Sequence, residues 1–218
     1  MNSPDLPAYD LLHFGVSTIG ASGGLLLDPE IHAIWHGAAV CGPAFTVTAG
    51  AADNLAVQVA VAEAPVGSVI VVRATEPPER GYWGELLTTQ AIAAGILGVV
   101  IDGNCRDVDA LTNLGFPVFA TGVSARAANR VEGGSVGGDV MVGGVEISPG
   151  DIIVGDSDGV VVVKEQDIEI VIRNSSARAA AEAQWLEALE DGATTIDLLG
   201  LDTSSVEHRE NNSNWQRE

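Results

Sequence analysis

The hydrophobic positions of this chain fall into short runs rich in valine and isoleucine, separated by alanine-rich segments with helical spacing. Two of the runs, residues 68–73 and 98–101, each start beside or at a glycine and predict buried strands. Between them, residues 88–98 have the spacing of a helix. An alternation of buried strands and helices is typical of an α/β fold with a covered sheet.

A longer apolar run over residues 38–49 predicts a further strand, with a bulge or kink at Gly42-Pro43. After it, Asp53-Asn54 is a typical N-cap, and the spacing that follows predicts a helix over residues 55–64. Three shorter elements complete this part of the chain: a short helix within residues 9–21, a helix over 108–114 that ends at Gly115, and a strand over 116–120.

The last third of the chain is richer in glycine and β-branched residues, and it predicts antiparallel strands. Residues 133–144 suit β-hairpins, and residues 145–163 have the pattern of a β-meander with turns at 149–150 and 156–159. An alanine- and glutamate-rich segment over residues 165–191 predicts a helix, with Gly192 as its C-cap.

The length of 218 residues fits one domain. We expect an N-terminal segment with a short helix over residues 1–34, a main domain over 35–201, and a polar, disordered tail over 202–218. There is no internal repeat and no linker that would divide the main domain. The sequence therefore predicts a single α/β domain with a C-terminal helix.

Charge and composition restrict the classes of function. Thirty acidic and ten basic residues give a net charge of -20, which argues against a nucleic-acid partner. A site for an anion would need local donors to overcome this field. No apolar run approaches the about 20 residues of a membrane helix, and residues 1–10 lack the basic stretch of a secretory signal. We expect a cytoplasmic protein with no membrane partner.

The two cysteines, Cys41 and Cys105, are too few for a disulfide framework. Cys41 lies in a predicted strand and has the character of a small buried hydrophobic residue. Cys105 precedes Arg106, whose charge favours a thiolate, but no histidine lies near it in sequence to act as a base. Structural packing is the preferred interpretation for both cysteines.

Candidate chemistry gathers at two places where a predicted strand gives way to a helix. Gly84 precedes a helix whose first amides, at residues 85–87, are expected to be unpaired and to attract a carboxylate. Arg106-Asp107 pairs a guanidinium that can bind a carboxylate with an acid that can hold a hard divalent metal. Simpler alternatives stay open: Glu85 complements the dipole of its own helix, and Arg106-Asp107 is a surface ion pair or a helix start.

Four segments of the sequence together carry a family resemblance. They are Gly81-Tyr82-Trp83-Gly84-Glu85-Leu86-Leu87-Thr88-Thr89, Gly98-Val99-Val100-Ile101-Asp102-Gly103, Arg106-Asp107-Val108-Asp109 and Leu114-Gly115-Phe116-Pro117-Val118-Phe119. Supporting matches lie at residues 50–55 and 198–201. On these segments the chain resembles the RraA-like family over residues 35–201. The family includes 4-hydroxy-4-methyl-2-oxoglutarate/4-carboxy-4-hydroxy-2-oxoadipate aldolases and the regulator of ribonuclease activity A.

The resemblance implies an α-β-β-α sandwich of the swivelling β/β/α type, assembled as a trimer or a hexamer with active sites between adjacent subunits. The aldolases of the family depend on a divalent metal, Mg²⁺ or Mn²⁺, and release pyruvate from a small oxo acid by retro-aldol cleavage. Many also decarboxylate oxaloacetate, because both reactions pass through the pyruvate enolate. The chain is accordingly expected to be a metal-dependent lyase.

The resemblance also implies roles for particular residues. Asp107 would be the metal ligand, and Arg106 would hold the substrate carboxylate or keto oxygen and stabilise the enolate. Gly84 and the amides of Leu86 and Leu87 would bind the pyruvyl carboxylate at the helix start.

Two further carboxylates are implied near the metal. Glu85 would relay the proton of the C4 hydroxyl, although the family aldolases usually carry Asp at this position, and one more methylene moves the carboxylate by about a bond length. A glutamate from the C-terminal helix of a neighbouring subunit would complete the site. Glu182, Glu187 and Glu190 are the candidates, each with the alternative of an exposed helix glutamate.

Two other functional classes remain in view. One is a non-catalytic regulator that uses its acidic surface to bind a basic protein segment, such as that of a ribonuclease. The other is an α/β scaffold whose site has decayed, which the change to Glu85 allows. Retention of Arg106, Asp107 and the helix-start amides favours the enzyme.

Overall fold

The computed structural model describes residues 11–75 and 79–207. The chain forms two compact units, Met1–Arg178 and Ala179–Glu218. The boundary between them falls inside the long helix α5 (Ile168–Glu190). Within the described residues, every strand and both predicted site blocks belong to the first unit.

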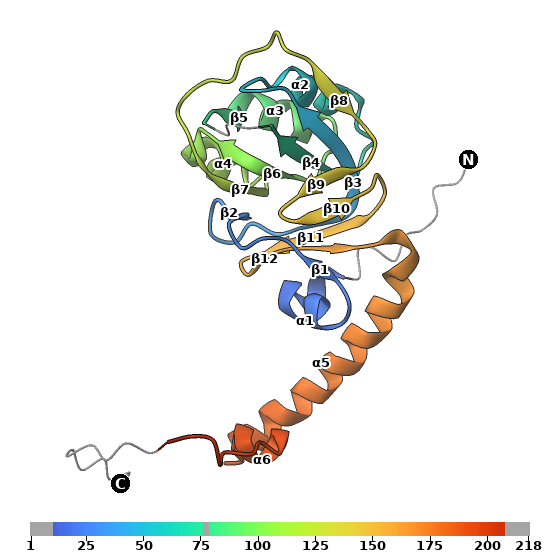
Figure 1. The fold of residues 1–218 in the computed structure, drawn as a ribbon, viewed down its shortest axis with the longest axis vertical. Helices are drawn as coiled ribbons and strands as arrows, with labels where there is room; N and C mark the ends of the chain where they lie inside the picture. Colours follow the sequence, from blue (N-terminus) through green and yellow to red (C-terminus); the bar gives the residue numbers. More distant parts are fainter. Residues whose placement is uncertain (1–10, 76–78, 208–218) are drawn as a thin grey trace, which may run out of the picture. The chain divides into compact units, whose positions relative to one another are not determined.

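A mixed sheet forms the framework of the first unit (Figure 1). Its strand order is β1-β12-β11-β3-β4-β6-β7-β2, with β5 paired to β6 and β8 paired to β3, while β9 and β10 form a separate hairpin. The neighbours β3, β4, β6 and β7 run parallel, as do β5 and β6. The strands are β1 (Leu25–Leu26), β2 (His32–Ala33), β3 (Val40–Ala49), β4 (Val69–Ala74), β5 (Gly81–Trp83), β6 (Gly98–Cys105), β7 (Val118–Val123), β8 (Gly134–Val136), β9 (Val140–Val142), β10 (Val145–Ile147), β11 (Ile152–Asp156) and β12 (Gly159–Val163).

The long strand β3 joins two layers of strands. Residues 40–43 pair with β11 in antiparallel register, and residues 44–49 pair with β4 in parallel register. Of the bulge or kink expected at Gly42-Pro43, the bulge is absent, because the register with β11 is unbroken through both residues. This dipeptide is instead the point at which the strand changes its neighbour.

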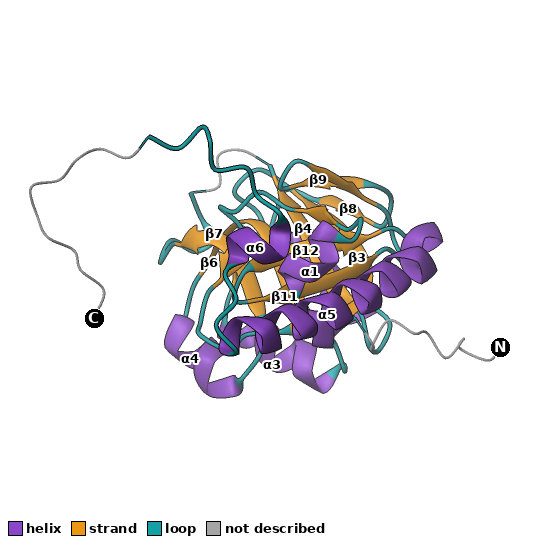
Figure 2. Ribbon diagram, turned by 90° about the horizontal axis from the view of Figure 1, so that it is seen from below, coloured by secondary structure: helices purple, strands orange, loops and turns teal. Residues whose placement is uncertain are grey.

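Alternate residues along the strands enter three successive hydrophobic cores, which define the layers. In β4, Ile70 packs with the core under α2, α3 and α4, whereas Val71 faces the core between the strand layers. In β12, Val162 faces that same middle core, and Val161 packs outward with α1 and the start of α5. Helices thus lie outside two layers of strands (Figures 1 and 2), and the predicted α-β-β-α sandwich is confirmed. The helices of this unit are α1 (Val16–Ala21), α2 (Leu55–Glu63), α3 (Glu85–Ala93), α4 (Val108–Leu114) and the 3-10 turns η2 (Leu12–Phe14) and η3 (Glu165–Asp167).

The predicted β-meander over residues 145–163 is wrong as a continuous sheet. Hairpins β9–β10 and β11–β12 both form, but β10 pairs with β9 and β11 pairs with β3. The turn at Gly150 explains the difference, because its N–H donates to the carbonyl of Ala44, and Ala44 donates in return to Asp151. The chain is thereby attached to β3 instead of folding back on β10.

The observed helix ends agree more closely with the sequence-based predictions than the strand pairing does. Helix α4 has the predicted bounds, and Gly115 closes it in the left-handed region at φ 65°. Helix α2 starts at Leu55 as expected, but the Asn54 side chain makes no cap hydrogen bond. The neighbouring Asp53 accepts the Leu55 N–H instead, at 2.8 Å. The helix start was predicted correctly, and of the predicted pair Asp53-Asn54 it is the Asp53 side chain that binds the first turn.

The second unit contains the rest of α5 and the short helix α6 (Thr195–Leu199). Gly192 follows α5 with φ 98°, as predicted for a C-cap. Several large apolar side chains of this unit are exposed, namely Leu186, Ile196, Leu199, Leu201 and Val206. Residues 1–10 of the predicted N-terminal segment and 208–218 of the predicted tail lie outside the described residues. Among the helices described, none combines the length and apolar character needed to cross a membrane.

Candidate functional site

The two predicted blocks meet where β5 and β6 end. These strands are parallel neighbours, and Trp83 at the end of β5 pairs with Cys105 at the end of β6. One residue further on, the Arg106 N–H donates to the Trp83 carbonyl at 2.9 Å. Each strand then leads into a helix, β5 into α3 and β6 into α4. Ligands of open α/β sheets bind at such carboxyl ends.

Gly84 leaves space here for two neighbouring side chains. Its φ of −171° is extended backbone that any residue adopts, so backbone strain is not the reason. A Cβ at this position would lie 2.5 Å from Asp107 Oδ2 and 3.0 Å from Arg106 Cγ. Only glycine lets the start of α3 approach the Arg106-Asp107 pair this closely.

Asp107 occupies the N-cap position of α4 but does not cap it. Its backbone is left-handed, with φ 59° and ψ 39°, and its side chain makes no cap hydrogen bond to α4. The carboxylate Oδ2 accepts the Glu85 N–H at 3.1 Å and lies 3.5 Å from Arg106 Nε. Asp tolerates this backbone region better than most residues, and left-handed non-glycine residues gather at functional sites. Both simpler interpretations of Arg106-Asp107 are therefore present, because the two residues form an ion pair and lie at the start of α4. Asp107 also joins the start of α4 to the start of α3.

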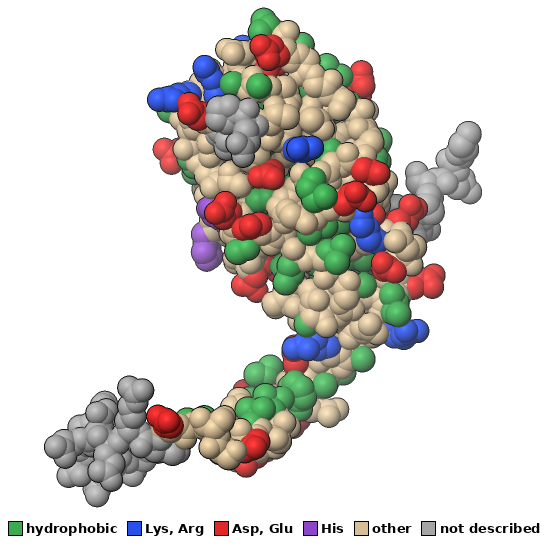
Figure 3. Space-filling model, viewed as in Figure 1, with side chains coloured by type: hydrophobic (Ala, Val, Ile, Leu, Met, Phe, Trp, Pro, Cys, Tyr) green, Lys and Arg blue, Asp and Glu red, His purple; other side chains and the backbone are tan. Residues whose placement is uncertain are grey.

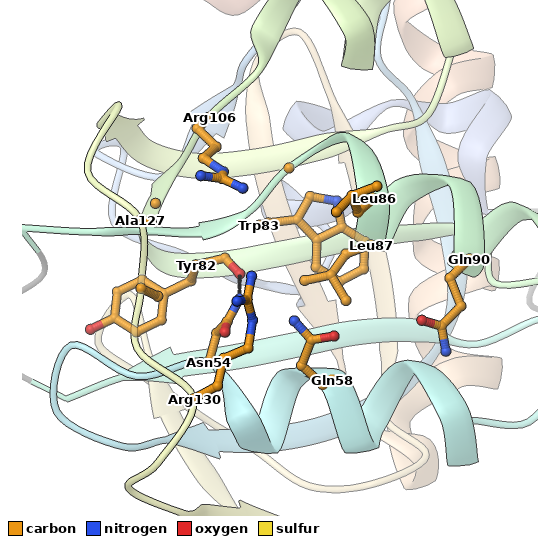
Figure 4. A pocket seen from close by; sticks show the side chains of 13 residues that line it. Asn54, Gln58, Tyr82, Trp83, Leu86, Leu87, Gln90, Arg106, Ala127 and Arg130 are labelled. Carbon is orange, nitrogen blue, oxygen red and sulfur yellow. Dashed lines mark hydrogen bonds between the residues drawn. The ribbon is translucent and has the colours of Figure 1, made fainter.

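A pocket of about 300 Å³ opens beside this junction (Figure 4). It is lined by two arginines and by no acidic residue, in a protein of net charge -20. Arg106 lies on one side of the pocket, and Arg130 lies with Asn54 on the other. On the face in Figure 3, acidic side chains are scattered over the surface. The pocket is therefore a local cationic site suited to an anion. Its lining residues are Asn54, Gln58, Gly81, Tyr82, Trp83, Gly84, Leu86, Leu87, Gln90, Arg106, Ala127, Ala128 and Arg130.

The start of α3 offers two backbone donors to the pocket. Three free amides were expected at residues 85–87, but Asp107 accepts that of Glu85. Those of Leu86 and Leu87 make no hydrogen bond to any residue in the described ranges, and both residues line the pocket. The site prediction thus retains two of its three amides, which point to a carboxylate or phosphate ligand.

Asn54 contributes a buried acceptor to the same pocket. Its Nδ2 donates to the Tyr82 carbonyl at 2.9 Å, which fixes the orientation of the amide. Its Oδ1 is buried and accepts no hydrogen bond from the residues that the structure describes. An unpaired buried acceptor costs about 1–3 kcal/mol, so this oxygen calls for a donor from water or from a ligand.

Glu85 takes part through its backbone. Its N–H contacts Asp107, and Glu85 is not among the residues that line the pocket. Glu182, Glu187 and Glu190 belong to the second unit. The catalytic role of Glu85 and the contribution of a neighbouring C-terminal glutamate stay predictions.

The residues present fit a hydrated, hard divalent cation. Within residues 11–75 and 79–207, no three His, Cys, Asp or Glu side chains come close enough together to enclose a metal ion. Asp107 is a partly exposed carboxylate whose hydrogen bond and ion pair both use Oδ2, which leaves Oδ1 for a ligand. Mg²⁺ is commonly held by one or two carboxylates and keeps several waters. The donor set therefore suits Mg²⁺ or Mn²⁺ better than a metal that requires a full protein cage.

Trp83 and Cys105 are buried at the ends of β5 and β6. The Trp83 ring is buried, stacks on Phe116 with ring centroids 5.9 Å apart, and donates from Nε1 to Thr88 Oγ1 at 2.7 Å. Burial, with a smaller contribution from Asp107, raises the pKa of the Cys105 thiol to about 12. Burial raises the pKa of Cys41 to about 12 as well. The packing interpretation of both cysteines is confirmed.

We expect neither cysteine of the folded protein to react with iodoacetamide at pH 8. The thiolate is the reactive species, and it forms in quantity only as the pH approaches about 12. Mass spectrometry of native and denatured samples measures this, with two labels expected after denaturation. Stoichiometric labelling of Cys105 in the native protein would contradict the packing role.

Arg130 and Asn54 were missed as site residues from the sequence. Asn54 was noted as part of a helix cap and of the family match at residues 50–55, and Arg130 lies in a segment without recognisable periodicity. The available signal was the scarcity of basic residues, ten in the whole chain, which makes every arginine a candidate for an anion site.

The fold and the site define an α/β sandwich with a pocket, lined by two arginines, at the end of two parallel strands. Residues 15–162 match the model of the RraA-like family, described as aldolase/RraA. The chain belongs to the RraA-like family.

Two relatives of known sequence show the range of this similarity. A protein of Halalkalibacterium halodurans named "Putative 4-hydroxy-4-methyl-2-oxoglutarate aldolase" is 38% identical over 157 residues, which cover 72% of this chain and 75% of the relative. Protein DlpA of Legionella pneumophila is 32% identical over 182 residues, which cover 80% of this chain and 29% of that longer protein.

Solved structures agree on the fold. An uncharacterized protein from Pseudomonas syringae superposes with a TM-score of 0.75 at 28% identity, covering 88% of this chain and 98% of its own. RraAS2 of Streptomyces coelicolor, described as an unusual member of the RNase ES inhibitor RraA family, has a TM-score of 0.71 at 28% identity, covering 87% of this chain and 98% of its own.

Proposed function

We propose that the protein is a divalent-metal-dependent lyase that cleaves a 4-hydroxy-2-oxo acid to pyruvate, and that it also decarboxylates oxaloacetate. The observation that carries the proposal is the junction of β5 and β6, where Arg106, Asp107 and the free amides of α3 come together beside one pocket. The relative named as a 4-hydroxy-4-methyl-2-oxoglutarate aldolase supports the same reaction class.

In this proposal the pyruvyl end of the substrate lies at the start of α3. The amides of Leu86 and Leu87 bind its carboxylate, assisted by the positive end of the helix dipole. Arg106 donates to the C2 keto oxygen, where negative charge develops. A cation held at Asp107 supplies Lewis-acid polarisation of the same keto group when bound. Gly84 keeps these groups within reach of one another.

Cleavage then requires a proton to leave the C4 hydroxyl. An electron pair of the C4 oxygen then forms the new C4 carbonyl, and the C3–C4 bond breaks. The electrons of that bond pass to the C2 oxygen, which gives the pyruvate enolate. Arg106 stabilises this enolate through its fixed positive charge, and protonation at C3 gives pyruvate. We assign the proton transfer to Glu85 acting through water.

The far side of the pocket suits a second anionic group. Arg130 lies there with Asn54, and no acidic residue lines the pocket to oppose an anion. We propose that Arg130 binds the distal carboxylate of the substrate. The favoured substrates are therefore oxo acids with two or more carboxylates.

Pyruvate release from oxaloacetate and from 4-hydroxy-4-methyl-2-oxoglutarate tests the proposal directly. We expect turnover of both substrates with Mg²⁺ or Mn²⁺, a fall to the background rate with EDTA, and recovery when excess metal is added. The pyruvate is measured with lactate dehydrogenase and NADH. Turnover of neither substrate in the presence of metal would reject the lyase.

A non-catalytic regulator is the second candidate, favoured by the similarity to RraAS2. Its acidic surface would bind a basic segment of a protein such as a ribonuclease. The same assay separates the two functions, because a regulator gives no metal-dependent pyruvate in any condition.

We further propose that the protein is a homo-oligomer, a trimer or a hexamer. The exposed Leu186, Ile196 and Leu199 of the second unit support this, because apolar side chains gathered on a small helical unit favour association.

A further inference from the structure

Arg130 reaches the pocket from a part of the chain with little regular structure. Residues 124–133 connect β7 to β8, and their only β-type pairing within the described chain consists of isolated bridges at Ala127 and Asn129. A segment outside regular structure lacks the hydrogen-bond ladder of a strand, so other contacts must hold the backbone that carries a long side chain. Something must therefore fix the segment for Arg130 to act as a binding group.

The residue before Arg130 is fixed by backbone contacts. The Asn129 N–H donates to the Ala52 carbonyl at 2.9 Å, and the Asn129 carbonyl accepts the Asn54 N–H at 3.0 Å. These contacts attach the segment to the chain just before α2, next to the pocket residue Asn54.

The two residues after Arg130 are fixed by one buried carboxylate. Asp53 is fully buried, and its Oδ2 accepts the N–H groups of Val131 at 2.6 Å and Glu132 at 2.9 Å. Its Oδ1 accepts the Leu55 N–H at 2.8 Å, which ties the same side chain to the start of α2. Both oxygens are thus used, and each one holds a different segment.

The surroundings of Asp53 favour its charged form, which binds backbone N–H groups well. Burial opposes ionisation, but the N–H groups of Glu132, Val131 and Leu55 and the nearby charge of Arg130 outweigh it and lower the pKa of Asp53. Hydrogen bonds from backbone N–H groups to an ionised acceptor are stronger than those to a neutral one.

We propose that Asp53 is the positioning residue that holds Arg130 in the pocket and so sets the preference for a substrate with a distal carboxylate. The preference rests on the proposed function, whereas the positioning does not. Asp53 touches no substrate in this scheme and acts through the backbone on both sides of Arg130.

Asp53→Asn tests the proposal, because the amide keeps the size of the side chain and loses its charge and one acceptor. For 4-hydroxy-4-methyl-2-oxoglutarate we expect KM to rise about tenfold with kcat little changed. For 4-hydroxy-2-oxopentanoate, which has no distal carboxylate, both constants should stay within about twofold. In an Arg130→Ala background, Asp53→Asn should have no further effect on KM. Equal losses on both substrates, or a full additional loss in the Arg130→Ala background, would overturn the proposal.

A control variant separates positioning from general destabilisation. Asp151 is also buried, accepts the Ser148 N–H at 2.8 Å and pairs with Lys164 at 2.7 Å, and it is not among the pocket residues. Asp151→Asn should lower thermal stability and leave the ratio of the two substrates unchanged. Should Asp53→Asn fail to fold, Asp53→Glu keeps the charge, displaces the carboxylate, and is expected to change the substrate ratio in the same direction.

Amide hydrogen exchange and a crystal structure test the positioning without any turnover. In Asp53→Asn the amides of Val131 and Glu132 should exchange faster than in the wild type, while Asp151→Asn should leave them protected. If the wild type cleaves no oxo acid, the proposed function fails, and these measurements still decide the role of Asp53. Unchanged protection, or an Arg130 guanidinium that stays in the pocket of the Asp53→Asn crystal structure, would show that Asp53 does not position it.

Discussion

Arg106→Ala is expected to lower kcat for pyruvate release by about 10²–10³-fold, the usual cost of removing one donor to a developing oxyanion. Arg106 lines the pocket, and its backbone is anchored to the Trp83 carbonyl, so the guanidinium has a fixed origin beside the start of α3. Its removal leaves the enolate charge without its fixed cation. Turnover of oxaloacetate and of 4-hydroxy-4-methyl-2-oxoglutarate, measured at saturating Mg²⁺, should fall together, because both give the same enolate.

Arg126→Ala is the matched control for this loss of charge. Arg126 is an exposed arginine whose guanidinium pairs with Glu79 at 2.9 Å, and it does not line the pocket. Exposed ion pairs contribute little, about 0–1 kcal/mol, so kcat and thermal stability should change little. An Arg106→Ala enzyme with the turnover of Arg126→Ala would exclude Arg106 from the mechanism.

Gly84→Ala is expected to reduce kcat/KM by at least about 10²-fold while the protein still folds. The added methyl group would lie 2.5 Å from Asp107 Oδ2 and 3.0 Å from Arg106 Cγ, so both side chains must move. Backbone strain is not introduced, because the φ of −171° suits alanine. Steady-state kinetics across a Mg²⁺ titration should also show that more Mg²⁺ is needed for half-maximal activity, since the displaced Asp107 is the assigned metal ligand.

Thr89→Ala provides the comparison on the same helix. Thr89 is exposed, and its hydroxyl donates to the Glu85 carbonyl within α3. This variant changes the helix without adding an atom between the two helix starts, and its activity should stay near that of the wild type. Full activity of Gly84→Ala would mean that the close approach at Gly84 has no part in catalysis.

The two arginines of the pocket differ in how far the sequence could locate them. The local pattern marks Arg106 as a candidate, because a buried strand, a polar end and a helix start are consecutive in the chain, and the family resemblance gives it a role. Arg130 depends on contacts between segments almost 80 residues apart, which join Asp53 to Val131 and Glu132. No periodicity records such contacts, so the second side of the pocket emerges only from the fold.

The same distinction applies to the sheet. Hydrophobic runs located the longer strands β3, β4, β6 and β7, and helix α4 has the bounds that its pattern predicts, whereas the short strands β1, β2 and β5 were not predicted. The pairing partner of each strand was harder to predict from the sequence. Pairing depends on which strand edge is still unpaired when the chain returns to the sheet. The contact of Gly150 with Ala44 removes β11 from the expected meander, although its own sequence remains typical of a strand.

The interaction of Glu85 shows how a residue can be located correctly while its contacts are misjudged. The sequence indicates a helix start at this position, and the first turn of α3 begins there. Its N–H is nevertheless taken by Asp107, a residue 22 positions away. The carboxylate, one methylene longer than the family aldolases usually carry, stays the least constrained part of the proposed mechanism.

The strand β3 has a mechanical consequence for this site. The backbone of β3 forms hydrogen bonds with β11 in one layer and with β4 in the other. Movement or unfolding of one strand layer therefore disrupts the other. The two layers therefore behave as a single rigid frame in which unfolding is cooperative. A ligand bound at the β5–β6 junction, as proposed, would meet groups whose spacing the frame has already set, and adjustment would be left to side chains and to the connecting segments at its rim.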